Sequence, residues 1–394
     1  MNNLQLREGK IEFRWKRWRN KKRQEVSYCL MVLFSGALLL LGGGGLANAG
    51  PTGGQVTGGT GTISQAGTTT TIDQTSNVLS INWQTFSTAP NETVNFVQPG
   101  ATSLAINRVV GGVPSFLQGA LNANGRVFIL NSAGITFTGT SSVNVGALLA
   151  TTAMSISGDP NQLASYSAPA GSGGAVINQG SITVSNGGFA ILAAPYVQNT
   201  GFIKADLGTV ALAGTNSFTL DLRGDGLINF VVPPGTAAQI AADGQKVGVD
   251  NSGTLQARSG QVIISANVAT QVVNAVVNMT GVVDADSIAA DAAGGSVLVT
   301  STGDINLGGT ITAQGNGTGA GGSIVTKAGG VDNIESGANL IAGGHAPGQG
   351  GHIEVSGKGV IWDGNIDPGY GGSLLLDPQN INITTVTGCT NLAA

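Results

Sequence analysis

The chain has 394 residues, of which 41% are apolar, 10% are charged, 5% are aromatic and 64 are glycine. This apolar content excludes a wholly disordered chain, the sparse charge excludes a coiled coil, and the glycines lack the strict period of collagen. A repetitive β architecture rich in Val, Ile, Thr, Asn and Gly remains.

Charge is divided unevenly along the chain. Residues 1–49 contain nine Lys or Arg and three Asp or Glu, whereas the remainder contains eight and eighteen, so the net charges are +6 and −10. A remainder this acidic repels phosphate groups, and nucleic acid is therefore not expected as a partner.

The N-terminus combines a basic segment, an apolar stretch and a small-residue motif. The apolar stretch covers Tyr28–Leu41, which is short for a membrane span, and the A-x-A pattern Ala47-Asn-Ala49 follows it. We therefore predict that residues 1–49 form an extended signal peptide that is cleaved at the motif of Ala47 and Ala49. The alternative interpretation is a membrane anchor.

Short β-prone runs separated by Gly, Asn, Ser or Asp make up the sequence after residue 50. Gly-Gly pairs that precede such runs begin at Gly294, Gly321, Gly350 and Gly371, at steps of 27, 29 and 21 residues. Short strands with a period of about 20–30 residues are typical of a solenoid whose coils stack about 4.8 Å apart. The sequence predicts an all-β fold, a right-handed parallel β-helix in which Gly and Asn occupy corners that need positive φ.

The ends of a solenoid present open sheet edges and need protection. Residues 50–100 are less periodic than the rest, and we expect them to supply an N-terminal β cap. The chain stops directly after a strand-rich repeat, which suggests that residues 301–394 are the start of a longer, truncated shaft of β-helix repeats.

The densest group of motifs lies between residues 72 and 152. In order, these are Ile72-Asp-Gln-Thr-Ser-Asn, Ile81-Asn-Trp-Gln-Thr-Phe, Ala105-Ile-Asn-Arg-Val, Leu121-Asn-Ala-Asn-Gly-Arg-Val-Phe-Ile-Leu-Asn-Ser-Ala-Gly-Ile-Thr-Phe and Val143-Asn-Val-Gly-Ala-Leu-Leu-Ala-Thr-Thr. They resemble the N-terminal secretion domain, or haemagglutination activity domain, of filamentous haemagglutinin-like proteins. Those proteins are the exported members of two-partner secretion systems. The resemblance covers residues 50–300, which we assign to this domain.

The resemblance implies a non-enzymatic chain without a cofactor. It implies recognition by periplasmic domains of an outer-membrane β-barrel transporter, and folding as a secreted or cell-surface protein. Candidate transporter-recognition or cap residues are Asn107, Arg108, Asn122, Asn124, Gly125, Asn131 and Gly134. The alternative role of these Asn and Gly residues is to hold turns.

One motif departs from the family pattern. The family usually has Asn-Pro-Asn-Gly where this chain has Asn131-Ser-Ala-Gly134. Ser-Ala still permits a type I-like turn, although with less preorganisation than Pro provides. We expect the fold to be retained and transporter recognition to be the property at risk.

The end use implied by the resemblance is that of an adhesin or haemagglutinin, which contacts receptors on host or bacterial cells. One alternative is the stalk of a contact-dependent growth inhibition protein, which requires a C-terminal toxin domain. A second alternative is a secreted β-helix enzyme that acts on polysaccharides.

Several strings that look functional are expected to be structural. Arg223-Gly-Asp, for example, has the form of an integrin-binding tripeptide. Four Asn-x-Ser/Thr sequons begin at Asn91, Asn278, Asn316 and Asn382, and for these the alternative of glycosylation stays open. The string Gly317-x-Gly-x-x-Gly precedes a predicted strand, whereas a dinucleotide site needs a helix there.

Possible metal and catalytic groups are also sparse. His345 and His352 lack the cysteines or dense carboxylates of a zinc site. Asp284, Asp286 and Asp291 are the densest carboxylates, and no Lys or Arg lies between Arg258 and Lys327 to serve as a basic partner. We expect these aspartates to be solvated on the surface.

Overall fold

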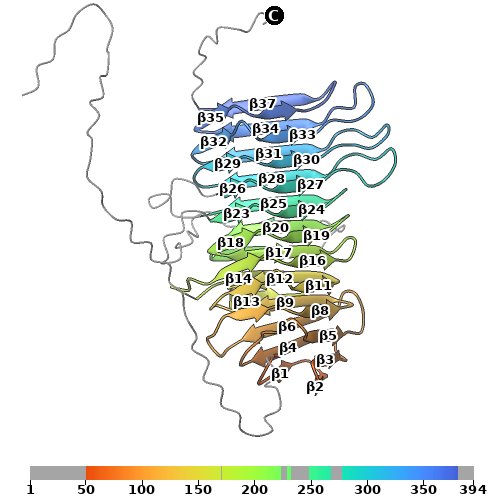
Figure 1. Cartoon of the computed structure of the whole chain (residues 1–394), viewed down its shortest axis with the longest axis vertical. Coiled ribbons are helices and arrows are strands. Elements are labelled where there is room, and N and C mark those ends of the chain that lie inside the picture. Colours follow the sequence, from red (N-terminus) through yellow and green to blue (C-terminus); the bar gives the residue numbers. More distant parts are fainter. Residues whose placement is uncertain (1–49, 170, 223–228, 232–247, 268–276, 380–394) are drawn as a thin grey trace, which may run out of the picture. The chain divides into compact units, whose positions relative to one another are not determined.

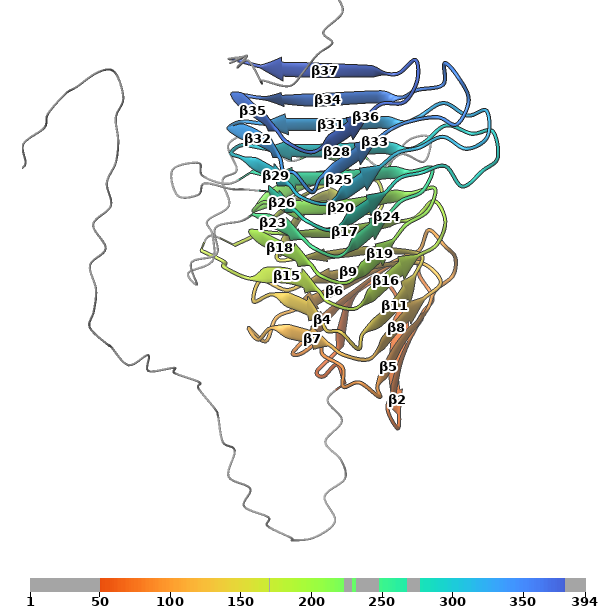
Figure 2. The same cartoon turned by 45° about the horizontal axis from the view of Figure 1, so that its top comes forward.

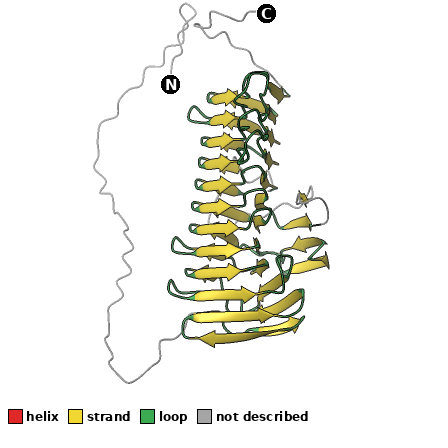
Figure 3. Cartoon of the chain, turned by 90° about the vertical axis from the view of Figure 1, so that its right-hand side faces the viewer, coloured by secondary structure: helices red, strands yellow, loops and turns green. Residues whose placement is uncertain are grey.

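The computed structural model describes residues 50–169, 171–222, 229–231, 248–267 and 277–379. Every regular element among these residues is a β-strand (Figure 3). The described part of the chain accordingly contains no helix that is long and apolar enough to cross a membrane. The predicted signal peptide with Ala47 and Ala49, the Arg223-Gly-Asp string and Asn382 lie outside the described residues.

Three sheets of stacked strands form the body of the fold (Figures 1 and 2). The first sheet consists, in spatial order, of β1 (Gln55–Gly58), β4 (Val78–Trp83), β6 (Leu104–Val109), β9 (Arg126–Leu130), β12 (Ala147–Thr151), β17 (Phe189–Ala194), β20 (Thr209–Gly214), β25 (Gln261–Ala266), β28 (Ser296–Ser301), β31 (Ser323–Ala328), β34 (His352–Gly357) and β37 (Ser373–Pro378).

In the other two sheets, too, the spatial order of the strands is their order along the chain. The second sheet consists of β7 (Ser115–Leu117), β10 (Ile135–Phe137), β15 (Ala175–Asn178), β18 (Tyr196–Asn199), β23 (Val249–Asn251), β26 (Val277–Met279), β29 (Ile305–Leu307), β32 (Val331–Ile334) and β35 (Gly359–Trp362). The third sheet consists of β2 (Gly61–Ala66), β3 (Thr69–Gln74), β5 (Thr93–Val97), β8 (Ala120–Ala123), β11 (Ser142–Val145), β16 (Ser181–Val184), β19 (Phe202–Lys204), β24 (Thr254–Gln256), β27 (Val282–Asp284), β30 (Thr310–Thr312), β33 (Asn339–Ile341) and β36 (Asn365–Asp367).

One coil passes through the first, second and third sheets in turn, as β9, β10 and β11 do before β12 returns to the first sheet. Equivalent strands of successive coils pair in parallel, for example β9 with β12 and β10 with β15. The predicted parallel β-helix is therefore confirmed.

The Gly-Gly steps equal the lengths of whole coils. Ser296, Ser323, His352 and Ser373 each follow a Gly-Gly pair, and each pairs with the next in the parallel register. Successive partners are 27, 29 and 21 residues apart, as the sequence period predicts.

Most of these glycines are required by close approach between coils and lack positive φ, whereas Gly371, with φ of +80°, agrees with the expectation for corners. A Cβ on Gly322 would lie 2.0 Å from the carbonyl oxygen of Gly295, and one on Gly351 would lie 2.3 Å from that of Gly322. Neither residue has positive φ. A column of glycines lets the backbone turn inside the space that a side chain would fill.

The interior of the helix is a continuous apolar core because alternate residues of each strand point inward. In the first sheet, for example, Ala105 and Val127 are fully buried and belong to one cluster that extends to Val355. Each coil buries its apolar side chains only against neighbouring coils, so stacking stabilises the fold.

The N-terminal cap is shorter than expected. Antiparallel pairing in the three sheets is confined to β1 with β4 and β2 with β3, whereas β3 and β4 already pair in parallel with β5 and β6. The two strands within Gln55–Ala66 cover the first coil, and residues from Thr69 to 100 belong to the helix itself.

A fourth, antiparallel sheet lies against the outer face of the first sheet and projects to one side of the stack (Figure 3). This lateral sheet contains β13 (Ser155–Asp159), β14 (Leu163–Ser167), β21 (Ser217–Asp221) and β22 (Asn229–Val231). It arises from two insertions, one between β12 and β15 and one after β20. This sheet was not predicted from the sequence.

The outer face beneath the lateral sheet forms a second apolar core. Phe128 of β9 meets Tyr166 of β14 edge to face, with 6.3 Å between ring centroids, and Tyr166 stacks on Phe218 of β21 at 4.9 Å. Both faces of the first sheet are therefore buried in these coils, which explains near-continuous apolar runs such as that of β12.

Candidate functional site

Asn107 lies inside the β-helix. Its side chain is fully buried, and Oδ1 accepts a hydrogen bond of 3.0 Å from Nε1 of Trp83. Nδ2 donates to the carbonyl oxygen of Phe128 at 3.2 Å. The amide thus links three successive strands of the first sheet, β4, β6 and β9, and it is not available to a partner in the folded state.

Arg108 points to the opposite side of β6, next to Leu130 in the parallel register. It is partly exposed beside the lateral sheet. Burial raises the pKa of Tyr166, and the positive charge of Arg108 opposes this effect. Among the seven predicted residues, Arg108 is the one that carries charge to the surface.

Asn124 and Gly125 form a turn together with a residue that the sequence analysis missed, Gln98. Asn124 accepts from the backbone nitrogen of Gln98 and donates to its carbonyl oxygen, both at 2.8 Å. The nitrogen of Gly125 donates to Oε1 of Gln98 at 2.9 Å, and a Cβ on Gly125 would lie 2.7 Å from the carbonyl oxygen of Ser103.

Gln98 continues this network into the preceding coil. Its Nε2 donates to Oε1 of Gln74 at 3.1 Å, and Nε2 of Gln74 donates to the carbonyl oxygen of Ser76 at 2.8 Å. Both glutamine side chains are buried. Both glutamines stand at the end of a strand in which buried and exposed residues alternate, and this position is the sequence signal that could have identified them. An inward-facing amide at such a position must form hydrogen bonds to the turn that follows.

Asn122 belongs to a ladder of asparagines on the outer face of the third sheet. It pairs in register with Asn95 and Asn144, and its Nδ2 donates to Oδ1 of Asn95 at 3.0 Å. Asn144 is exposed. This ladder offers uncharged polar groups to the solvent.

The Asn131-Ser-Ala-Gly134 segment is a hydrogen-bonded turn. The nitrogen of Gly134 donates to the carbonyl oxygen of Asn131 at 3.0 Å, and Gly134 has φ of +110°. The side chain of Asn131 is fully buried, and its Nδ2 donates to the carbonyl oxygen of Val113 and to Oγ of Ser115, both at 2.9 Å. The turn expected for Ser-Ala is present.

The predicted residues lie in neighbouring coils but do not meet in one pocket. Asn107 and Asn131 point inward, Arg108 lies on the first sheet, and Asn122 lies on the third. In the folded chain the Asn and Gly residues among them hold turns and coils in place, and the part of all seven in transporter recognition remains a prediction.

A charged cluster on the third sheet also escaped the sequence analysis. Asp206 bonds bidentately to Arg258, with 2.7 Å from Nη2 and 3.2 Å from Nε, and Nζ of Lys204 lies 3.3 Å away. Burial alone would raise the pKa of Asp206, but the hydrogen bonds from Arg258, Gln256 and Lys204 outweigh it and lower the pKa to about 2.

The aspartates expected to be solvated take part in contacts between coils. Burial raises the pKa of Asp284, and the positive charge of Arg258 opposes this, so Asp284 does have a basic neighbour. Asp286 accepts from the nitrogen of Gln314 at 2.6 Å, and Asp291 accepts from that of Thr318 at 2.8 Å. The expectation of surface solvation was wrong for Asp284 and Asp286, which are half-buried, whereas Asp291 is exposed as expected.

The two histidines are separate. Nδ1 of His345 lies 2.9 Å from the carbonyl oxygen of Gly315, and Nδ1 of His352 lies 2.8 Å from Oγ of Ser373. No group of three His, Cys, Asp or Glu side chains suited to a metal ion occurs in the described part of the chain. The segment after Gly322 is the strand β31, as predicted.

Comparison with known families settles the kind of protein. The family described as TPS secretion domain, where TPS denotes two-partner secretion, matches residues 47–313. The chain belongs to this family. Exoproteins of this family are exported by an outer-membrane transporter, are secreted or surface-exposed, and are generally non-enzymatic.

Relatives agree with this assignment. Two heme/hemopexin-binding proteins of Haemophilus influenzae are 42% identical over 102 residues and 43% identical over 82 residues. These matches cover 26% and 21% of this chain but 11% and 9% of the relatives, so the chain spans about a tenth of their length.

A solved structure supports the fold. The secretion domain of HMW1 from Haemophilus influenzae superposes with a TM-score of 0.69 at 24% identity, and the match covers 85% of this chain and 97% of that one. At this identity the similarity shows a common β-helix and nothing about ligands.

Proposed function

We propose that this two-partner secretion domain directs the export of an adhesin- or haemagglutinin-like exoprotein whose β-helix carries a receptor-binding part to the cell surface. The family match to residues 47–313 is the observation that carries this proposal. The three sheets continue to Trp362, Asp367 and Pro378, which supports a shaft beyond the matched residues. The boundary between a domain of residues 50–300 and a shaft of 301–394 remains part of the proposal.

Recognition by the transporter is proposed to depend on the motif residues in two ways. Arg108 and Asn122 have side chains that are partly exposed in the folded chain, so a partner can touch them directly. Asn107 and Asn131 are buried in the folded chain. The transporter therefore contacts them before the chain folds, or they contribute indirectly by holding the turns.

Folding outside the cell is proposed to help draw the chain outward. Each coil completes its hydrogen bonds and buries its apolar residues on the coil before it, and the antiparallel cap gives the first coil a covered end. A β-helix that grows in this direction makes backward movement of the chain unfavourable.

The test of export uses the full chain in a Gram-negative host with and without the cognate outer-membrane transporter. The protein is quantified in the medium and in the periplasm. The proposal expects it in the medium only when the transporter is present. Retention in the periplasm under both conditions would contradict it.

Point variants separate recognition from folding. Arg108→Ala and Asn122→Ala are expected to slow export while the purified proteins keep their melting temperature, whereas Lys358→Ala, at an exposed position far along the chain, serves as a control. Wild-type export rates for both variants would remove direct contact from the proposal. A variant unable to fold that is still exported at the normal rate would remove the role of folding.

A further inference from the structure

A cleft opens on the outer face of the first sheet where one small side chain stands in a column of larger ones. Arg126 pairs with Ala147 in the parallel register, and the pairing of Leu148 with Ala190 puts Ala147 beside Phe189. Because Ala147 fills little space, a cleft of about 240 Å³ remains between Arg126 and Phe189.

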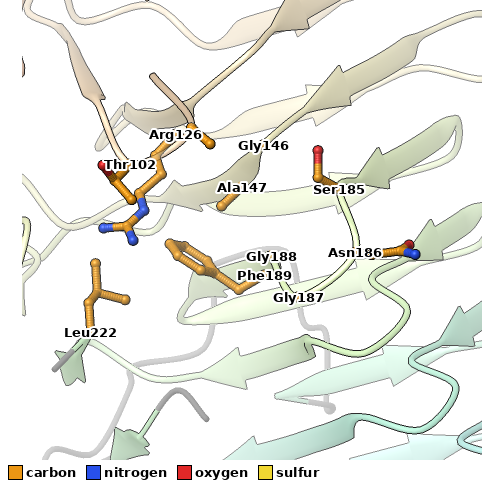
Figure 4. A pocket seen from close by; sticks show the side chains of 11 residues that line it. Thr102, Arg126, Gly146, Ala147, Ser185, Asn186, Gly187, Gly188, Phe189 and Leu222 are labelled. Carbon is orange, nitrogen blue, oxygen red and sulfur yellow. The ribbon is translucent and has the colours of Figure 1, made fainter. Parts of the chain in front are cut away.

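The guanidinium of Arg126 points into this cleft, toward Phe189 and Leu222 (Figure 4). It is partly buried, and its one hydrogen bond within the described residues is donated by Nη1 to Oδ1 of Asn161 at 2.7 Å. No carboxylate in the described part of the chain forms an ion pair with it. A guanidinium has five N–H donors, so most of its donor capacity is not used by the described residues.

Arg258 provides the internal comparison. That guanidinium is bound bidentately by Asp206, which raises its pKa, whereas burial without a counter-charge lowers the pKa of Arg126. A partly buried cation without a counter-charge is costly, and binding of an anion offsets that cost. The electrostatics of the cleft therefore suit an anionic ligand.

The walls indicate what the anion is attached to. The rim carries the small polar residues Thr102, Ser185 and Asn186, which can bond to hydroxyl groups. The floor is formed by Ala147 and the buried Phe189, which suit C–H groups. The volume is below the roughly 300–1,000 Å³ of sites for drug-sized ligands, so the cleft suits one small unit of a larger molecule.

The turn at the rim is built to stay open. The nitrogen of Gly188 donates to the carbonyl oxygen of Ser185 at 2.8 Å, and Gly187 has φ of +76°. A Cβ on Gly188 would lie 2.2 Å from the carbonyl oxygen of Gly146. The side of the cleft formed by this turn is thus glycine backbone that the fold itself requires.

We propose that this cleft binds an acidic sugar residue, with Arg126 holding its carboxylate and the polar rim holding its hydroxyl groups. A guanidinium binds a carboxylate through two parallel hydrogen bonds, which fixes the orientation of the sugar ring. The site lies within the secretion domain and does not depend on the identity of the exported passenger.

The test is calorimetric titration of the full chain with D-glucuronate, N-acetylneuraminate, D-glucose and acetate at low salt. D-Glucose has the same ring as D-glucuronate without the carboxylate, and acetate has the carboxylate without the ring. Binding of either acidic sugar at least tenfold tighter than D-glucose and acetate is expected, and which of the two binds distinguishes a uronic acid from a sialic acid. Equal affinity for acetate would reduce the site to a general anion site and overturn the proposal.

Variants locate the binding. Arg126→Gln is expected to weaken binding about tenfold or more, the effect of losing a charge-assisted hydrogen-bonded pair. Thr102→Trp keeps the charge but fills the cleft from its exposed rim, and is expected to abolish binding. Lys358→Gln removes one positive charge elsewhere and should leave affinity unchanged. Unaltered affinity in both cleft variants would place any binding elsewhere and refute the assignment.

Discussion

Nδ2 of Asn199 donates a hydrogen bond of 2.7 Å to Oδ1 of Asn251, which occupies the same position one coil further along the β-helix. Asn178 donates in the same way to Asn199, also at 2.7 Å. All three side chains are fully buried. The result is an asparagine ladder inside the corner between the second and third sheets.

Replacing the central member of this ladder should destabilise the protein. Asn199→Ala leaves the buried amides of Asn178 and Asn251 each without one partner, which we expect to lower the free energy of unfolding by about 2–3 kcal/mol. Guanidinium chloride denaturation measures this change. Asn144→Ala is the matched control because that asparagine is exposed, and equal midpoints for the two variants would contradict a structural role for the ladder.

Substitutions at two positions of the Asn131-Ser-Ala-Gly134 turn are expected to change stability in opposite directions. Gly134→Ala should lower stability by about 1–3 kcal/mol, because φ of +110° strains any residue with a Cβ. Ser132→Pro should raise it by about 0.4–1 kcal/mol, because Pro favours the second position of such a turn and restricts the unfolded chain. Thermal melting of both purified variants tests this, and destabilisation by Ser132→Pro would show that the local backbone rejects proline.

The sequence predicted the coils better than the contacts between distant segments. Gly-Gly spacing identified the coil length because a column of glycines is a strict local requirement of stacking, as at Gly295 and Gly322. The lateral sheet was missed because β14 and β21 come from two insertions about 50 residues apart. The local sequence of each strand does not indicate that the two pair.

The candidate residues were identified by motif, but their surroundings were not. Asn107 and Asn131 look like exposed turn residues in the sequence, yet inward-facing positions bury both. The ion pair of Asp206 with Arg258 joins residues 52 apart, across an insertion that hides the register. Contacts between side chains of different coils can be predicted only when the register of those coils is known.

Asp332 is a carboxyl group inside the apolar core. It stands in register between Ile305 and Val360, is fully buried, and accepts a hydrogen bond from Oγ1 of Thr326 at 2.5 Å. Its Oδ1 has no partner among the described residues. Burial raises the pKa of Asp332 from 3.8 to about 7, although the bond from Thr326 acts in the other direction.

Stability should therefore fall as the pH rises from about 4 to about 7. In that window the folded state holds a proton on Asp332 that the unfolded state has released, so each increase in pH favours unfolding. The predicted loss is up to about 4 kcal/mol for a shift of this size. Denaturation at pH 4.5, 6 and 8 measures it.

Asp332→Val should remove this pH dependence and raise stability at pH 8, because Ile305 and Val360 show that the column accepts aliphatic side chains. Asp363→Asn, at an exposed position of the next coil, is the control for a general charge effect. An unchanged pH profile in Asp332→Val would mean that other groups set the pH dependence.

The lateral sheet should be separable from the β-helix in stability. Tyr166 stacks on Phe218 and contacts Phe128, so Tyr166→Ala removes the aromatic contact between this sheet and the outer face of the first sheet. We expect a loss of about 3–5 kcal/mol from packing around that side chain.

The expected signature is binding of a hydrophobic dye with the far-ultraviolet spectrum of the β-helix retained, because the interior core does not include Tyr166. Tyr166→Phe is the matched control. The Tyr166 hydroxyl is buried and has no hydrogen-bond partner among the described residues, so its removal should leave stability unchanged or raise it by about 1 kcal/mol. If Tyr166→Ala instead unfolded the whole chain in one transition, the lateral sheet would be an integral part of the cooperative core.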